Sequence, residues 1–437
     1  MPDPAAPLSA STLVLRAKER EIDAVRHLAS QADLVDVIGQ LIQALQRERG
    51  ASSIYLASRG QRFADMRRTL VDEARPVEAR LREVVAADLE HAQAMTAKTL
   101  SLMAWALLGL DAMAALRTQI ERQAMSAHDS VAAFSHLIAG LIELVFQVAD
   151  AAQVPSVSRL LVAFLHLVQA QEEAGQERAV GALLYASGQV DEAHQQRVVH
   201  LIDAQERSLQ VFAEFADPAL RARLEEQQLV PGVARLERLR RTLCTARPAA
   251  VLDSNLSDTW FNVCTERMDE LWLLQVALVK RLREDCAARI VEAQQDLQDS
   301  RGLLRRLRDN PPPRTHAVDR FFDAATLPEA EQQRVPLPAG AESASLLDLL
   351  QAQSARMAGM EAELDTARRT LNERKVIDRA KGMLMSRLGI NEDVAFRMLQ
   401  KTSMDQNRRL LDVAEATLSL PDLAFASLAV QGDKGVR

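Results

Sequence analysis

Apolar residues recur every three or four positions along almost the whole chain, which is the spacing of one face of an α-helix. From about Leu13 to Arg308 such segments follow one another with short connections, and several exceed 20 residues. Alternating β-branched runs bounded by turn residues are missing, so no β-sheet is expected. Long helices with short connections are typical of up-and-down helical bundles, and the pattern predicts an all-α fold. Helix breaks are expected near Gly60, Pro76, Pro155, Gly188, Pro218, Pro231 and Pro248.

A proline-rich segment and a heptad repeat follow the predicted bundle. Residues 309–345 contain six prolines, which interrupt any regular helix, so this segment is predicted to be a partly extended linker. From Leu346 to Leu371 the apolar positions alternate by four and three residues, and Gln353 is the one polar residue of this seam. A repeat of nearly four heptads favours a coiled-coil dimer over a lone amphipathic helix.

Three short helices are predicted after the heptad repeat. The first ends at Gly389, the second begins after the cap-like Asn391, and the third begins near Asp405 or Gln406. The resulting domain prediction is a disordered N-terminus (1–12), a helical-bundle domain (13–308), a linker (309–345), a coiled-coil helix (346–372), a three-helix module (373–422) and a flexible tail (423–437).

Composition is that of a soluble helical protein of two or three domains. Apolar residues make up 48% and charged residues 26% of the 437 positions. The three cysteines lack the spacing of a disulfide framework or a metal site, so we expect free thiols in a reducing cytoplasm. The N-terminus has no signal-peptide features, and the two most hydrophobic windows, 100–116 and 131–146, are short for a bilayer span. We therefore expect a cytoplasmic protein without membrane contact, with both windows in buried helices.

Three arginines lie on helical faces that the apolar pattern predicts to be buried. Arg49 continues the stripe that contains Leu45, and Arg178 and Arg267 lie on similar stripes. None of them has a carboxylate at the neighbouring position of its own stripe. Burying an unpartnered cation costs several kcal/mol, so a negative partner is expected. That partner is either a carboxylate of another helix or a bound anion.

A guanidinium offers two parallel N–H groups, which suit a planar oxyanion. Small residues beside the arginines, such as Gly50 and Gly175, leave room for one. The pattern thus predicts an oxyanion-sensing site between helices, without choosing among nitrate, nitrite, formate, phosphate and carboxylate metabolites. The sequence has no glycine-rich phosphate loop, no His-x-x-x-His pair and no nucleophile motif. We therefore predict no catalytic residues, no metal ligands and no cofactor.

Positive charge is concentrated between Arg368 and Arg409, where eleven lysines and arginines accompany five acidic residues. This segment carries a net charge of +6, whereas the rest of the chain carries −13. Such asymmetry is typical of a nucleic-acid-binding module on an acidic protein, and a solvated charged surface is the alternative. Since Phe396 is the single aromatic residue of the segment, phosphate contacts are expected to supply most of the affinity.

Within this segment the sequence resembles the ANTAR RNA-binding module of antitermination regulators. The resemblance is carried by residues 377–385 (Ile-x-x-Ala-Lys-Gly-Met-Leu-Met), Ala395-Phe396, Leu399, Asn407 and residues 410–414. Ser403 departs from the alanine that often precedes the equivalent of Met404. The resemblance implies binding to RNA, and the core of the module is expected to include Met383, Leu384, Ala395, Leu399 and Val413. The candidates for phosphate contacts are Arg379, Lys381, Arg397, Lys401 and Arg408.

The first 308 residues resemble, more diffusely, the helical NIT domain that senses nitrate and nitrite. The segments RERGASSIYLASRG, QERAVGALL and TWFNVCTERMDELW carry this resemblance. In that family, inward arginines from facing helices bind the anion, and the match places this role on Arg49, Arg178 and Arg267. Arg47 is a further candidate in the first segment. The residues that compete with Arg267 are Arg235, Arg238 and Arg240.

The order of the two modules resembles that of nitrate-responsive antitermination regulators, which are not enzymes. The resemblance implies nitrate or nitrite as the ligand and hairpins of a leader mRNA as the partner. From the heptad repeat we also expect the protein to be a homodimer, at least in the active state. From the charge asymmetry, we expect anion binding to release the hold of the acidic N-terminal domain on the basic C-terminal module. The alternatives are a DNA-binding regulator that senses another oxyanion and a scaffold whose arginines pair internally.

Overall fold

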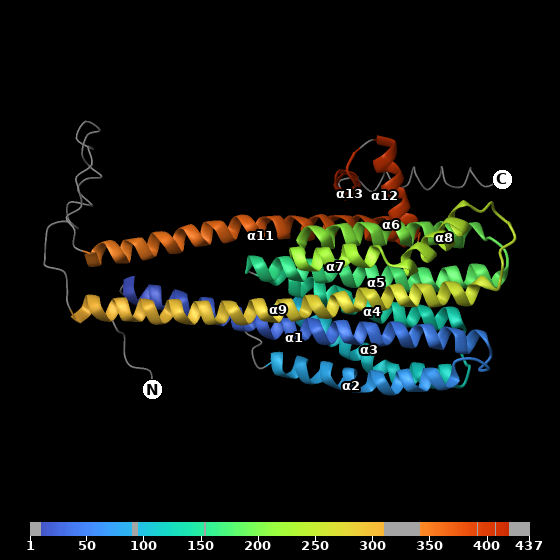
Figure 1. Cartoon of the computed structure of the whole chain (residues 1–437), viewed down its shortest axis with the longest axis horizontal. Coiled ribbons are helices and arrows are strands. Elements are labelled where there is room, and N and C mark those ends of the chain that lie inside the picture. The colour runs from blue at the N-terminus through green and yellow to red at the C-terminus, as the bar shows by residue number, and fades with distance from the viewer. Residues whose placement is uncertain are drawn as a thin grey trace.

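The computed structural model describes residues 10–89, 95–152, 154–309, 341–390, 392–406 and 408–418, and confirms the all-α prediction. In these ranges the regular elements are α-helices, and one isolated β-bridge joins Gln189 to Val251. The helices, shown in Figure 1, are α1 (Ala10–Ala57), α2 (Ala64–Leu89), α3 (Ala97–Glu121), α4 (Ala127–Ala151), α5 (Pro155–Ser187), α6 (Glu192–Phe215), α7 (Pro218–Gln228), α8 (Pro231–Thr245), α9 (Leu256–Asp309), α11 (Ala341–Leu388), α12 (Glu392–Gln406) and α13 (Leu410–Leu418).

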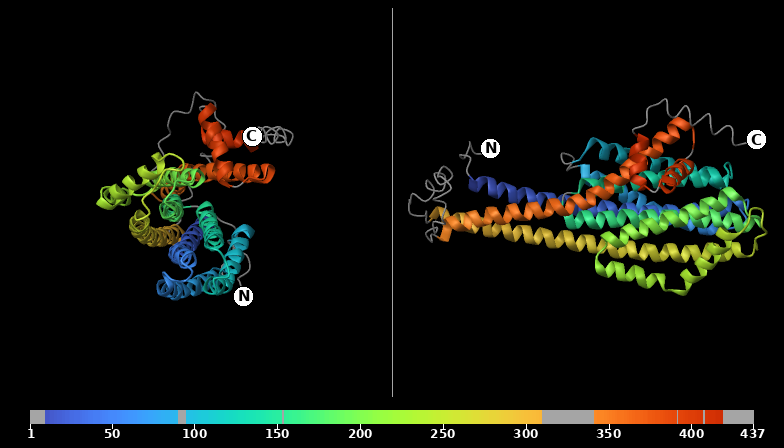
Figure 2. Two further views of the ribbon diagram at one scale, coloured as in Figure 1. Left: turned by 90° about the vertical axis from the view of Figure 1, so that its right-hand side faces the viewer. Right: turned by 90° about the horizontal axis from the view of Figure 1, so that it is seen from above.

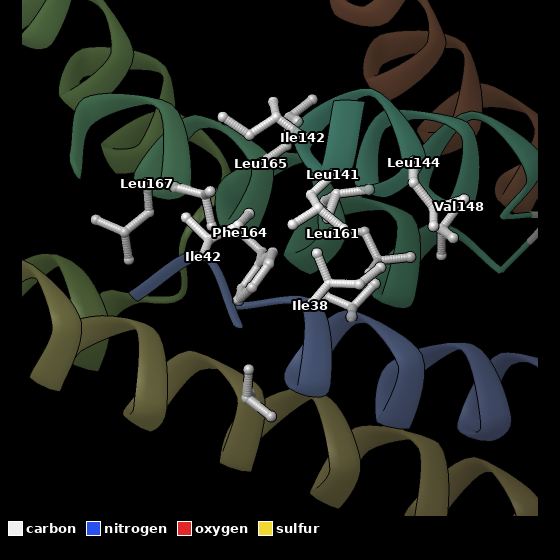
Figure 3. Close-up of a cluster of buried hydrophobic side chains, with 14 of the residues drawn as sticks. Ile38, Ile42, Leu141, Ile142, Leu144, Val148, Leu161, Phe164, Leu165 and Leu167 are labelled. Carbon is white, nitrogen blue, oxygen red and sulfur yellow. The ribbon is translucent and has the colours of Figure 1, made fainter. Parts of the chain in front are cut away.

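The sensor, as we call α1 to α9, is an elongated bundle whose core lies where α1, α4, α5 and α9 meet. Figure 2 shows the helices end-on and from above. Ile38 of α1, Leu141 of α4 and Leu161 of α5 are each at most 1% exposed, and Figure 3 shows that they converge. Gly39 lets α1 and α5 approach, because a Cβ there would lie 2.9 Å from the Phe164 ring. The continuous apolar stripes are thus satisfied by other helices of the same chain.

A second, smaller core joins the C-terminal part of α5 to α6, α8 and α9. The indole nitrogen of Trp260 donates a hydrogen bond to the carbonyl of Arg178 over 3.1 Å, and the Tyr185 hydroxyl donates to the Leu239 carbonyl over 3.0 Å. Gly181 is needed here, because a Cβ at this position would come within 2.2 Å of the Trp260 ring. This core holds the end of α5 that carries Arg178.

The predicted break at Pro76 is wrong, because α2 runs through this residue. Pro76 has no N–H group, so the carbonyl of Asp72 loses its helical hydrogen bond. Both residues lie on the exposed face of α2, where water can replace this bond. The other prolines behave as predicted: Pro155, Pro218 and Pro231 begin α5, α7 and α8.

The two most hydrophobic windows do not share one environment. By length and composition, α3 and α4 could each cross a membrane. Of the apolar window in α4, 56% is buried in the bundle, as predicted, but only 28% of the window in α3 is buried. The prediction of burial is therefore wrong for most of α3, which packs mainly on α4.

The long helix α11 lies along the sensor and leads into α12 and α13 (Figure 1). The side chains of the predicted heptad from Leu346 to Met360 lie outside the described residues, whereas Ala367 and Leu371 pack into the main core of the sensor. As predicted, α11 ends before Gly389, which has a φ of +66°. The third helix begins later than predicted, at Leu410, because α12 continues to Gln406.

Candidate functional site

Arg49 of α1 and Arg178 of α5 lie side by side at a close crossing of these two helices. Both are buried, at 2% and 5% exposure. A Cβ on Gly50 would lie 2.8 Å from Nη2 of Arg178, and a Cβ on Gly175 would lie 2.7 Å from Nη2 of Arg49. Each guanidinium is therefore seated against a glycine of the opposite helix. The structure brings these two predicted residues together.

Arg49 has an internal partner that the sequence analysis did not identify. Its Nη1 and Nη2 donate to Oε1 and Oε2 of Glu172 over 2.5 and 3.1 Å, and Nη1 also donates to Ser135 over 2.8 Å. Gln46 and Gln176 donate to the same carboxylate over 2.9 and 3.0 Å. For Arg49, the alternative of an ion pair between helices is thus the observed arrangement.

Arg178 differs, because no carboxylate lies within ion-pair distance of it among the described residues. Its Nη1 donates to the Thr265 hydroxyl over 2.9 Å, and its guanidinium lies 4.7 Å from the centre of the Phe261 ring. Burial, together with the charge of Arg49, lowers the pKa of Arg178 to about 10, so it stays protonated at neutral pH. Among the described residues, Arg49 is therefore ion-paired with a carboxylate and Arg178 is not, and the charges of Asp269 and Glu172 act on Arg178 from a longer distance.

Arg178 lines a cavity of about 890 Å³ between α1, α2, α5 and α9. Arg47 and Asp269 line the same cavity. Arg47 is half exposed and forms an ion pair of 3.0 Å with Glu73, which also lines the cavity. Burial raises the pKa of Asp269. The cavity gives a small ion a route to the guanidinium of Arg178, which forms no ion pair with the described residues.

Arg267 is not brought to this cavity. It lines a separate cavity of about 270 Å³ with Glu266, Glu270 and the start of α8. Two residues along a helix are about 200° apart, so Arg267 points away from Thr265, which faces Arg178. Nη1 of Arg267 is buried and has no hydrogen-bond partner among the described residues.

The competing arginines of α8 are also accounted for. Arg240 binds Glu177 through Nε and Nη2 over 2.8 and 2.6 Å, and these contacts raise its pKa against the effect of burial. Arg235 and Arg238 are exposed. None of these three arginines lines the cavity beside Arg178.

The reader, as we call the C-terminal part of α11 from Glu373 together with α12 and α13, has the predicted small core. Leu384, Ala395, Leu399 and Val413 are buried in it, and Met383 is partly buried against it. The predicted module thus exists as a packed unit on the side of the sensor.

The five predicted RNA contacts fall into two groups. Arg379, Lys401 and Arg408 are exposed. Lys381 is held by Asp378 and Glu392 over 2.7 and 2.8 Å. Arg397 donates to Gln196 of α6 over 2.6 Å.

The reader is docked on the sensor through two sets of contacts. Against α6, the Phe396 ring lies 5.0 Å from the His200 ring and 5.3 Å from the guanidinium of Arg207. Against α4, Lys375 forms an ion pair of 2.5 Å with Asp150. The sequence analysis did not identify the sensor residues of these contacts, because only the packing of the reader against α4 and α6 shows which residues they are.

Arg374 extends the contact of the reader with α4 toward the interior of the sensor. Its guanidinium lies 5.3 Å from the Phe146 ring, and its Nη1 is buried without a hydrogen-bond partner among the described residues. Burial, with a smaller effect of Arg374, lowers the pKa of His166 to about 3. Burial raises the pKa of Glu173 to about 8, which Ser208, Arg207 and Arg374 oppose. Glu173 directly follows Glu172 in α5, so the anion site and the docked reader share one helix.

Comparisons with known proteins agree with this architecture. The profile of the NIT family, described as nitrate and nitrite sensing, matches residues 40–283, and that of the ANTAR domain matches residues 365–418. The chain is 30% identical to the nitrate regulatory protein of Klebsiella oxytoca over 412 residues, which cover 93% of this chain and 94% of that protein. It is 32% identical over 72 residues to the transcriptional regulatory protein PdtaR of Mycobacterium tuberculosis, over 16% of this chain and 35% of that protein.

A solved structure of the NasR transcription antiterminator is similar to this chain with a TM-score of 0.59 and 27% identity, over 93% of this chain and 98% of that one. The relatives named here are regulators and not enzymes. The chain therefore belongs to the NIT family of nitrate- and nitrite-sensing proteins, and it joins this domain to an ANTAR domain in the manner of a nitrate-responsive transcription antitermination regulator.

Proposed function

We propose that nitrate or nitrite binds beside Arg49 and Arg178, and that binding controls the access of the reader to hairpins in a leader mRNA. The observation that carries this proposal is the buried guanidinium of Arg178, which faces a cavity of about 890 Å³ and has no carboxylate partner among the described residues. A planar oxyanion with one negative charge could be the partner of this guanidinium, because it matches the guanidinium in charge and in shape.

The other two candidates have different roles in the proposal. Arg47 lines the cavity and attracts the anion toward it. Arg267 lines another cavity, so we give it no direct contact with the anion that binds Arg178.

On the RNA side, Arg379, Lys401 and Arg408 are free to contact phosphates, while Lys381 and Arg397 lie near the contact with α6. We infer that the docked conformation exposes only part of the RNA-binding surface. The seam from Leu346 to Leu371 is proposed to form a homodimer after release, because Leu371 now packs on the sensor.

The proposal also includes the cellular location of the protein and its domain boundaries. We infer a cytoplasmic location, where leader transcripts are made. The proposed division is 13–308, 309–345, 346–372 and 373–422. The ANTAR match, 365–418, begins inside the proposed coiled-coil helix and ends four residues before the proposed end of the module.

Calorimetric titration of the full-length protein with nitrate and with nitrite tests the anion site. We expect Arg178→Ala to abolish the binding of both ions, and Arg223→Ala, at an exposed position of α7, to leave it unchanged. Nitrate affinity in Arg178→Ala equal to that of the wild type contradicts the site. Transcription through a leader with two hairpins and a terminator tests the output, and nitrate should raise read-through only with the intact protein.

A DNA-binding regulator is the rival, because a basic three-helix module also suits a major groove. Binding titrations at several salt concentrations separate the two functions. Affinity for the leader hairpins that exceeds affinity for promoter duplex at every salt concentration supports the RNA function.

A further inference from the structure

The carboxylate of Glu172 fills the guanidinium fork of Arg49. Its two oxygens accept from Nη1 and Nη2 of Arg49 over 2.5 and 3.1 Å. A carboxylate and a nitrate ion are both planar, carry one negative charge and present two oxygens to such a fork. In this conformation an internal group therefore occupies the position on Arg49 that a bound anion needs.

A displaced Glu172 requires another cation, because an unpaired buried carboxylate is strongly unfavourable. The structure offers Arg197 of α6 through one intermediate side chain. Gln176 donates to Oε1 of Glu172 over 3.0 Å and accepts from Nη2 of Arg197 over 2.5 Å. A continuous chain of hydrogen bonds thus leads from Arg49 to Arg197.

Arg197 also faces the reader. Burial and the charge of Arg397 lower its pKa, whereas the carboxylates of Glu392, at the start of α12, and of Glu173 and Glu172 in α5 raise it. The same guanidinium is therefore close to an acidic group of the reader and to the one that holds Arg49. Gln196, the residue before Arg197, accepts the hydrogen bond of Arg397.

We propose that Glu172 is an internal counter-ion that the anion displaces, and that the displaced carboxylate pairs with Arg197 and weakens the attraction of Arg197 for Glu392. The inference rests on the proposed anion site and specifies how that site is coupled to the reader. Charge stays balanced, because the anion replaces the Glu172 carboxylate on Arg49 and the displaced carboxylate moves to the cation of Arg197. Glu392 keeps its ion pair of 2.8 Å with Lys381. The attraction between Arg197 of α6 and the acidic start of α12 becomes weaker, so docking weakens.

The anion can shift this equilibrium because its affinity differs between the two states. In the docked state Glu172 competes for Arg49, and in the released state it does not. The strength of the Glu172 contacts therefore sets the anion concentration at which the regulator responds.

Glu172→Gln in the full-length protein tests the displacement. The variant keeps the shape of the side chain but removes the competing charge, so we expect nitrate affinity in calorimetry to rise at least tenfold. Glu225→Gln, an exposed carboxylate of α7, is the matched control and should leave the affinity unchanged. Hydrogen–deuterium exchange of residues 392–406 should rise on adding nitrate to the wild type but not to Glu172→Gln, because glutamine carries no charge to attract Arg197.

Two further variants test the connection to the reader. Gln176→Met has a similar length but no hydrogen bonds, so the nitrate-dependent exchange of residues 392–406 should be lost. Nitrate affinity should rise, because Glu172 loses one of its hydrogen-bond donors. Arg197→Gln should show, without nitrate, the exchange that the wild type shows with it. Arg223→Gln is the control for removal of a positive charge at an exposed position.

The outcomes separate the coupling from the site itself. Unchanged or weaker nitrate affinity in folded Glu172→Gln, with binding abolished in Arg178→Ala, overturns the displacement and leaves the site in place. If Arg178→Ala binds nitrate with the affinity of the wild type, the proposed anion site is wrong, and the displacement of Glu172 is wrong as well. If circular dichroism shows that Glu172→Gln does not fold, Arg197→Gln decides, and unchanged protection of residues 392–406 in that variant overturns the proposal.

Discussion

Replacing each arginine of the site by methionine should change the stability of the unliganded protein in opposite directions. Arg178 is a buried cation without a carboxylate, and its pKa is lowered from 12.5 to about 10, chiefly by burial. At about 1.4 kcal/mol for each pH unit, this lowering corresponds to about 3 kcal/mol by which folding disfavours the charge. Because the pKa is lower in the folded state, the unfavourable contribution is fully present below pH 10 and disappears as the pH rises through 12.5.

Arg178→Met removes that cost together with the hydrogen bond to Thr265 and the contact with Phe261, each worth about 1 kcal/mol, and a long hydrogen bond of 3.4 Å to the Gln46 carbonyl, which contributes less. We therefore expect the unliganded variant to be about 1 kcal/mol more stable than the wild type, which is a rise of about 2 °C in Tm. Arg49→Met instead leaves Glu172 buried without its cation, and we expect a loss of about 3 kcal/mol.

Thermal denaturation followed by circular dichroism measures both effects, with and without nitrate. At a nitrate concentration of about 100 times Kd, the wild type should gain about 2.7 kcal/mol, whereas neither variant should gain any. The double variant Arg49→Met/Glu172→Met should recover most of the stability lost in Arg49→Met. The reasoning is refuted if Arg178→Met melts several degrees below the wild type without nitrate, or if nitrate stabilises it as much as the wild type.

Four more predictions concern single features of the structure. Gly50→Ala should push Arg178 aside and weaken nitrate binding in calorimetry about tenfold, which equals about 1.4 kcal/mol. Gly302→Ala is the control, because a Cβ there meets nothing within 4 Å, and equal nitrate affinities in the two variants contradict the close crossing. Lys401→Ala should lower the slope of log RNA affinity against log salt by about one, and an unchanged slope removes this exposed residue from the RNA surface. Deletion of residues 1–310 should give a fragment that binds RNA without nitrate and self-associates in sedimentation, so a monomer at high concentration argues against the coiled coil. Glu173→Gln should remove a pH dependence of unfolding, because a carboxyl whose pKa is raised from 4.5 to about 8 stabilises the fold below pH 4.5 and loses that effect as the pH rises through 8; parallel pH profiles of the two proteins contradict this.

Much of the fold was accessible from spacing alone, because helix formation depends on residues close together in the chain. The stripes of α1, α5 and α9, the prolines at the starts of α5, α7 and α8, and Gly389 after α11 are local signals, and the structure confirms them. Pro76 misled because its effect depends on exposure: on the solvent face of α2 the freed carbonyl can bind water and the helix continues. The apolar character of α3 likewise did not reveal that most of its window lies outside the core.

The candidate site shows the same division. The sequence alone indicated that Arg49 and Arg178 point inward, since each lies on an apolar stripe beside small residues. It did not indicate that Glu172 fills the fork of Arg49, because the partner comes from another helix and lies off the stripe of Arg178.

Arg267 and the docked reader were likewise settled by packing. The spacing that placed Arg267 on a buried face does not say which of two cavities that face meets. The basic charge of the reader predicted an acidic counterpart, which Asp150 of α4 provides for Lys375. It did not predict the contacts of the reader with Gln196, His200 and Arg207 of α6, none of which is acidic. Periodicity along one helix specifies which side chains are buried, whereas the partners they meet depend on how separate helices pack, and only the tertiary structure determines that.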